Sequence, residues 1–307
     1  MGKPAAAATY KLRFPTVGGH STMQVQVPRG PMRLRDLVPL AQRVTSINVE
    51  QAVEQEKREG RLVSCKRGCA ACCRQLVPIS APEAFRLADH VLSLDDRTRD
   101  LFLARIDAAE SAVEAAGLMQ DLEAIAAGGS AGDVKALAAR YFEHKIDCPF
   151  LHEEACTVHA ERPLVCRDYM VTTPAELCAS PARKSVRTVP MPPVLSAPLA
   201  RAAAALTGEA PVMIPLSIAM RWVDAHADQG FQEWPGAEVM RALIAGGEGR
   251  APAPLSVQRR FFDAWLAPWA FDCCAAIGAC SLANYYRPAS ELSGAFLAIE
   301  RDSLANG

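Results

Sequence analysis

Hydrophobic and polar residues alternate in two short stretches near the start of the chain, TYKLRF (residues 9–14) and TMQVQV (residues 22–27). Alternation with a period of two is typical of β-strands that bury one face. Gly18 and Gly19 lie between the two stretches and suit a tight turn. The pattern therefore predicts a small β-hairpin near the N-terminus.

Apolar residues recur at helical spacing through most of the remaining chain. Residues 34–44 predict a helix that Pro39 kinks or divides, and good helix formers continue from Ser46 to about Arg61. Ser80 and Glu83 form a capping-box pattern around a proline, so a helix should begin there. Further helices are predicted from Asp95 or Asp96 to Val113 and over residues 119–127, 131–144, 196–206, 214–228, 237–245 and 256–268.

These elements define a fold class. No repeat of fixed period is present, and strands do not alternate with helices, which argues against a parallel α/β fold. We expect a mainly α-helical protein: an irregular helical domain with a cysteine-rich metal-binding centre and the small hairpin. The predicted units are a hairpin and helix (1–45), a cysteine-cluster domain (46–180) and a C-terminal helical region packed on it (181–307).

Composition narrows the environment and the partners. The chain has 307 residues, of which 50% are hydrophobic and 22% are charged, and its net charge is -1. This balance is that of an ordinary globular protein, so we expect no nucleic-acid partner, while a protein partner stays open. The apolar runs are shorter than the roughly 20 residues that span a bilayer, and no secretory signal is evident. We expect a cytoplasmic protein without a membrane partner.

Cysteine is the residue type that changes the picture. The chain has 11 cysteines, and the cytoplasm keeps thiols reduced, so metal binding explains them better than disulfides do. Cys65, Cys69, Cys72 and Cys73 are close in sequence, and either a helix or a tight loop at Gly68 would gather them. The usual zinc knuckle leaves at least two residues between its cysteines. The adjacent Cys72 and Cys73 therefore indicate more than one metal, or a cluster.

A second group consists of Cys148, Cys156 and Cys166. Three cysteines cannot satisfy a four-coordinate ion alone, so this group should draw ligands from the first group and meet it at one centre. His152 or His159 could supply an eighth ligand. Nearby cations would neutralise the thiolates, although a solvated basic surface explains them equally well: Lys66, Arg67, Arg74, Arg162 and Arg167.

The stretches CKRGCAACCRQLVPIS, CPFL, CTVH, RP and CRDY, within about residues 60–170, carry a family resemblance. Together they resemble the cysteine-cluster proteins described as CxxCxxCC or YkgJ-like, which are regarded as zinc- or iron-chelating. Two departures are the three residues between Cys65 and Cys69, and His159 where many relatives have tyrosine. The resemblance implies metal or iron–sulfur binding, without a settled reaction.

We therefore predict a metal-binding protein with seven sulfur ligands, namely Cys65, Cys69, Cys72, Cys73, Cys148, Cys156 and Cys166. An iron–sulfur cluster or iron is favoured slightly over Zn²⁺, because adjacent cysteines and an excess of thiolates suit a polynuclear centre. Iron would imply a redox or metal-dependent role. Zinc would imply a structural or interaction module.

Other readings of the cysteines remain. A flagellin lysine methylase has a cysteine-rich segment of this style, so a metal-dependent protein-modifying enzyme is the main alternative. The spacing of Cys65, Cys69 and Cys72 also matches radical S-adenosylmethionine enzymes, but Ala71 replaces their usual aromatic residue and no (β/α) repeat follows. The remaining thiols are read as small buried hydrophobes, with a second metal site as the alternative: Cys178, Cys273, Cys274 and Cys280.

Overall fold

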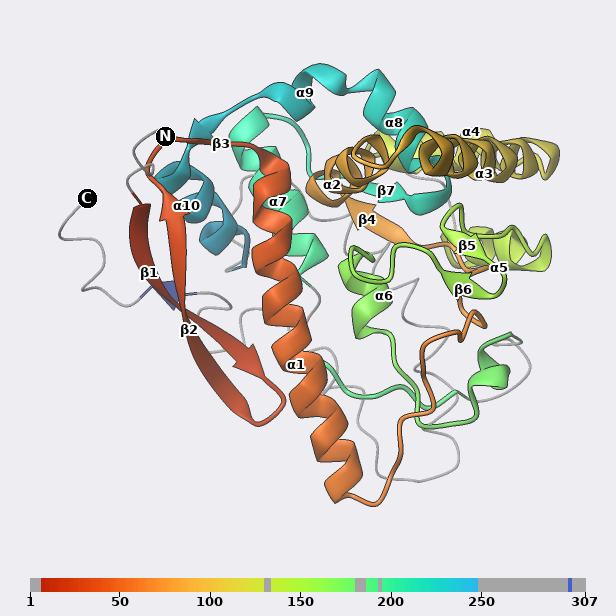
Figure 1. The fold of residues 1–307 in the computed structure, drawn as a ribbon, viewed down its shortest axis with the longest axis horizontal. Coiled ribbons are helices and arrows are strands. Elements are labelled where there is room, and N and C mark those ends of the chain that lie inside the picture. The colour runs from red at the N-terminus through yellow and green to blue at the C-terminus, as the bar shows by residue number, and fades with distance from the viewer. Residues whose placement is uncertain (1–6, 130–133, 180–185, 193–194, 248–297, 300–307) are drawn as a thin grey trace.

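The protein is described by a computed structural model, in which residues 7–129, 134–179, 186–192, 195–247 and 298–299 are placed (Figure 1). The predicted N-terminal hairpin is confirmed. Strands β1 (Ala7–Thr16) and β2 (Gly19–Pro28) pair antiparallel, with Tyr10 opposite Val25. The short strand β9 (Ala298–Ile299) pairs with the other edge of β1. Leu12 and Phe14 on the inner face of β1 are buried, as the alternating pattern requires.

A long helix joins the hairpin to the cysteine segments. The chain forms a 3₁₀-helix, η1 (Leu34–Leu37), and then the helix α1 (Val38–Arg58). The boundary between these two elements falls beside Pro39, as predicted. Pro39 lies in the first turn of α1, where proline is tolerated. The helix α1 runs between the hairpin and α6 (Leu164–Asp168) (Figure 1). It continues across residue 45, and the division of the chain into three units stays a prediction.

The predicted helices of residues 80–145 are also found. They are α2 (Ala81–Leu92), α3 (Asp96–Ala115), α4 (Met119–Ala126) and α5 (Val134–Glu143). Asp95 caps α3 by accepting a hydrogen bond from the Thr98 backbone N–H at 3.0 Å. Ser80 and Glu83 form the capping box at α2. The buried faces of these helices build the larger hydrophobic core together with α7 (Ser196–Thr207) and α8 (Ala219–Ala225).

The prediction of one helix over residues 214–228 is wrong. The chain instead forms β7 (Met213–Pro215), a 3₁₀-helix η4 (Leu216–Ile218) and two short helices, α8 (Ala219–Ala225) and α9 (Ala227–Phe231). Strand β7 pairs antiparallel with β4 (Pro78–Ser80). The Leu216 backbone N–H also donates to the Val77 carbonyl at 2.8 Å. This pairing satisfies buried backbone groups that a local helical pattern does not anticipate.

The remaining helices complete the second core. Helices α7 (Ser196–Thr207) and α10 (Gly236–Gly247) match two predictions and pack against each other. Together with α1 they cover the inner face of the hairpin. A short pair, β3 (Pro31–Met32) with β8 (Trp234–Pro235), joins the hairpin to α10. The helix predicted over residues 256–268 lies outside the described residues. Within those that are described, none of the helices has the length and apolar character to cross a lipid bilayer.

Gly236 is expected to be essential to the junction between β2 and α10. A Cβ atom at this position would lie 2.0 Å from the Pro28 carbonyl oxygen, so Gly236→Ala must displace backbone. We expect a loss of about 2 kcal/mol or more in the free energy of unfolding, measured by urea denaturation. The control is Gly18→Ala, because a Cβ atom at Gly18 meets nothing within 4 Å. Equal stability of the two variants would contradict this account of the junction.

Candidate metal centre

The first cysteine segment is a series of tight turns. Three backbone hydrogen bonds each join residues three apart: Cys69 N–H to the Lys66 carbonyl, Cys73 N–H to the Ala70 carbonyl and Gln75 N–H to the Cys72 carbonyl. Gly68 has a φ of 84°, a conformation that glycine adopts without strain. Of the two geometries that the sequence allowed, the structure has the loop. The turns bring the four thiols together without a helix.

The second segment is a hairpin followed by a short helix. Strands β5 (Leu151–His152) and β6 (Ala155–Cys156) pair antiparallel, and Glu153 and Glu154 form the turn with φ values of 47° and 54°. Positive φ at both turn positions is the geometry of a type I′ turn. Residue 163 is a proline that fixes the entry into α6, and Cys166 lies on that helix. Cys156 therefore lies on strand β6, and Cys166 lies on helix α6.

The two segments meet through direct contacts. The Cys148 backbone N–H donates to the Cys73 carbonyl at 2.9 Å, and the Ser64 N–H donates to the Val171 carbonyl at 2.8 Å. In return, the Val171 N–H donates to the Cys65 sulfur at 3.4 Å. All of the cysteines within the described residues are free thiols. These contacts bring the two cysteine segments side by side, with no disulfide among the described cysteines.

Cys72 interacts electrostatically with thiols of both segments. Burial raises the pKa of Cys148 to about 12, and the charges of Cys156 and Cys72 act in the same direction. Burial likewise raises the pKa of Cys156 and Cys166, with a contribution from Cys72 to each. On the other side, burial raises the pKa of Cys65, and Cys72 and Cys69 add to it. A hydrogen bond with Cys73, together with burial, raises the pKa of Cys72 itself. Such mutual repulsion is what a bound cation would relieve.

Arg162 is a cation that interacts with thiols of both segments, and Arg167 acts with it at Cys156. Burial raises the pKa of Cys65, Cys156 and Cys166, and the Arg162 guanidinium opposes that rise at each of them. Its Nε atom is buried and has no hydrogen-bond partner among the residues that the structure describes. A buried donor without a partner costs roughly 1–3 kcal/mol. An anionic thiolate centre beside Arg162 would give this donor an acceptor.

Arg74 does not serve the thiols in the way that the sequence suggested. Its guanidinium pairs with Asp147 at 2.6 Å and with Glu154 at 2.6 Å, so its charge is compensated by carboxylates. Both carboxylates belong to the second segment, and Arg74 therefore links the two segments at the surface. Lys66 and Arg67 are exposed, which agrees with a solvated basic surface.

Cys178 was not among the predicted ligands, yet it lies with the thiols. It belongs to the 3₁₀-helix η2 (Ala175–Ala179) and packs with Val171 and Val186 in a small cluster that also includes Cys65. Burial raises its pKa to about 12, and the charge of Cys72 adds to that rise. The available sequence signal was the count of sulfur atoms, since seven thiols are one short of two four-coordinate sets. Cys273, Cys274 and Cys280 lie outside the described residues.

The donor chemistry fits a metal that prefers sulfur, although the thiols are not arranged as a complete coordination site. Within the described parts of the chain, no three side chains of cysteine, histidine, aspartate or glutamate are placed so that they could hold an ion as they stand. Clustered thiols suit zinc, iron or an iron–sulfur cluster, and the buried Nε of Arg162 fits an anionic centre. Binding would therefore require the sulfur atoms to draw closer.

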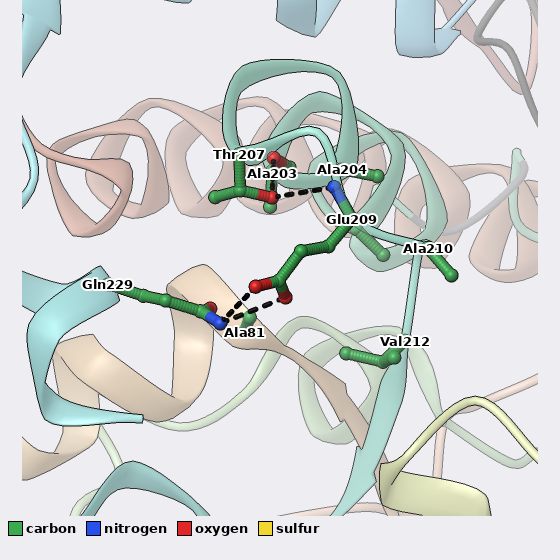
Figure 2. Close-up of a pocket in the computed structure, with 9 residues that line it drawn as sticks. Ala81, Ala203, Ala204, Thr207, Glu209, Ala210, Val212 and Gln229 are labelled. Carbon is green, nitrogen blue, oxygen red and sulfur yellow. Dashed lines mark hydrogen bonds between the residues drawn. The ribbon is translucent and has the colours of Figure 1, made fainter. Parts of the chain in front are cut away.

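A small hollow lies away from the thiols, between α7 and the start of α2 (Figure 2). Alanines line much of it, and Gln229 closes one side by donating to both carboxylate oxygens of Glu209 at 2.8 Å. Its volume of about 10 Å³ is that of a single water molecule. This hollow cannot accept a nucleoside-sized cofactor such as S-adenosylmethionine.

Comparison with known proteins identifies one family. Residues 64–183 match the model of the family described as "CxxCxxCC: Putative zinc- or iron-chelating domain". No curated protein and no solved structure matches the chain. The family resemblance inferred from the cysteine pattern is thereby confirmed. The match supports a cysteine-cluster protein that binds a metal, zinc or iron.

Proposed function

We propose that this chain, whose residues 64–183 match the CxxCxxCC family model, binds zinc or iron through thiolates from two remote segments. The proposed ligands are Cys65, Cys69, Cys72, Cys73, Cys148, Cys156 and Cys166. The observation that carries the proposal is the hydrogen bond from the Cys148 backbone N–H to the Cys73 carbonyl at 2.9 Å, which joins the two cysteine segments. The bound metal would then hold together parts of the chain that lie on either side of helices α2–α5.

The proposed centre would change the protonation of the thiols, and the metal that it holds would decide between a redox and a structural role. Each thiolate would lose its proton to bind, and the metal would offset the repulsion between neighbouring sulfurs. Arg162 would remain beside them as a donor to sulfur. We favour an iron–sulfur centre, because the adjacent Cys72 and Cys73 suit a polynuclear group, and Zn²⁺ is the alternative occupant. An iron–sulfur centre would give the protein a redox role, and zinc would give it a structural one.

Elemental analysis of protein purified without oxygen tests the proposal directly. We expect stoichiometric iron with acid-labile sulfide and broad visible absorbance if the centre is an iron–sulfur cluster. A colourless protein with stoichiometric zinc would support metal binding and remove the iron assignment. Protein that contains neither metal, and does not take one up when reduced, would contradict the proposed function.

Arg162 is expected to raise the affinity of the centre for its metal. Arg162→Gln removes the charge and the Nε donor that face Cys65, Cys156 and Cys166. Partners that hydrogen-bond to metal ligands typically contribute about 10- to 100-fold to affinity. We expect a weakening of that size, measured by competition with a chromogenic chelator.

Arg74→Gln is the matched control for this measurement. It removes the same charge from a residue next to Cys73, but Arg74 donates to Asp147 and Glu154 rather than to sulfur. We expect its effect on metal affinity to be less than about 3-fold, because the pairs are at the surface. Equal effects of the two variants would show that net charge alone is responsible.

A further inference from the structure

The adjacent Cys72 and Cys73 lie at the contact between the two cysteine segments, because the Cys148 backbone N–H donates to the Cys73 carbonyl at 2.9 Å. Cys72 contributes to the electrostatics of Cys65 on one side and of Cys148, Cys156 and Cys166 on the other. Its thiol also forms a hydrogen bond with Cys73. The pair is therefore located where the two segments meet. Since a four-sulfur site rarely uses two adjacent cysteines, each member of the pair suits a different site.

Cys178 supplies the sulfur atom that this division requires. Its side chain is 3% exposed and packs in the small cluster with Val171, Val186 and Cys65. The Tyr169 hydroxyl lies 4.0 Å from the Cys178 sulfur. The backbone N–H of Val171, a member of the same cluster, donates to the Cys65 sulfur at 3.4 Å. Cys178 and Cys65 thus face the same small space. Packing alone would explain a buried cysteine, but not a cluster that holds a second thiol, Cys65, nor the contribution of Cys72 to its raised pKa.

The histidines are poorer candidates for the eighth ligand. The side chain of His152 is 59% exposed, and its Nε2 atom lies 4.0 Å from the Glu153 carboxylate. His159 is also exposed. Burial lowers the pKa of His159, and the charges of Arg162 and Arg167 lower it further. A buried sulfur beside the other thiols is therefore a better match for a metal that prefers sulfur.

We infer that Cys178 is a metal ligand, and that eight cysteines form two four-sulfur sites which meet at Cys72 and Cys73. One site takes Cys65, Cys69 and Cys178 together with one sulfur of the pair. The other takes Cys148, Cys156 and Cys166 together with the second sulfur. This inference rests on the proposed function and adds to it a ligand, a count of sites and a reason for the adjacent cysteines.

Titration of metal-free, fully reduced protein with Zn²⁺ or Co²⁺ in the absence of oxygen tests the inference. We expect the wild-type protein to bind two ions per chain, with sulfur-to-cobalt charge-transfer absorbance. Cys178→Ala should bind one ion and lose about half of that absorbance, and Cys166→Ala should do the same through the other site. Cys178→Ser, which preserves the size of the side chain, should also bind one ion.

Val186→Ala is the matched control, because it removes apolar atoms from the same small cluster without removing sulfur. It should still bind two ions, whereas a role for Cys178 in packing alone predicts that it behaves like Cys178→Ala. The inference is overturned if both Cys178 variants bind as many ions as wild type, or if wild type binds a single ion. Wild-type protein that binds no ion would instead overturn the proposed function.

Discussion

Removal of the metal is expected to lower the melting temperature of the protein by about 10 °C or more. The proposed ligands lie on turns and very short elements, and the polar contacts between the two segments include a few backbone hydrogen bonds, a hydrogen bond from Val171 to the Cys65 sulfur and the surface pairs of Arg74. Metal–thiolate bonds would be the strongest link between these segments. Without them, the segments keep buried thiols beside one another and a buried donor on Arg162 that has no partner.

Calorimetry of metal-loaded and chelated protein, both reduced and free of oxygen, measures this effect. Adding back the native metal should restore the melting temperature. Mg²⁺, which prefers oxygen ligands, should not restore it. A chelated protein that melts within about 2 °C of the loaded one would show that the metal does not hold the segments together.

Replacement of Glu83 should have the largest effect of any substitution away from the thiols. Its buried carboxylate accepts hydrogen bonds from the Ser80 N–H at 2.9 Å, the Ser80 hydroxyl at 2.6 Å and the Leu164 N–H at 2.9 Å. One side chain thus joins the start of α2 to the start of α6, the helix that carries Cys166. Glu83→Ala leaves these buried donors without an acceptor. We expect a loss of about 3 kcal/mol or more in the free energy of unfolding, measured by urea denaturation.

The same residue gives a pH dependence with a definite sign. Burial raises the pKa of Glu83, although hydrogen bonds from Ser80 and Leu164 oppose the rise. Asp168 of α6 is a neighbouring carboxyl group, and burial together with the charge of Glu83 raises its pKa to about 8. A raised pKa in the folded state contributes stability that is present below the unfolded value near 4.5 and is lost as the pH rises through the folded value. Glu83→Gln cannot ionise. The stability of wild type relative to this variant should therefore fall as the pH rises above 4.5.

Urea denaturation of both proteins between pH 4.5 and pH 8 checks this sign. Glu54→Gln, on the exposed side of α1, is the control and should change little relative to wild type over that range. A stability difference between wild type and Glu83→Gln that grows with pH would contradict the assignment of a raised pKa to Glu83.

The sequence predicted the long elements and not the short ones. The hairpin and helices such as α2, α3, α7 and α10 have enough residues to show a period, and caps such as Asp95 mark their ends. Strands β4 and β7 have three residues each and are buried throughout. No period can be read from so short a segment, and their pairing depends on long-range contact. That is why residues 214–228 were read as one helix.

The site shows the same division between local pattern and long-range contact. Cysteine spacing was enough to predict that the two segments gather, because thiols in such numbers need a common partner. The position of Cys178 could not be predicted in this way, since it depends on Val171 and Val186 and on the return of the chain past Cys65. The sequence named Arg74 and Arg162 alike as cations for the thiols, and the pairing of Arg74 with Asp147 and Glu154 likewise depends on long-range contact.

The order of the segments along the chain has a consequence for biosynthesis. The turn-rich loop with Cys65, Cys69, Cys72 and Cys73 leaves the ribosome before all of α2–α5, while Cys148, Cys156, Cys166 and Cys178 follow them. The early thiols must wait, reduced and incompletely coordinated, until the later ones have been synthesised. Metal loading of the proposed centre is therefore a late event, and a nascent chain that stalls within α2–α5 would present its four thiols to oxidants.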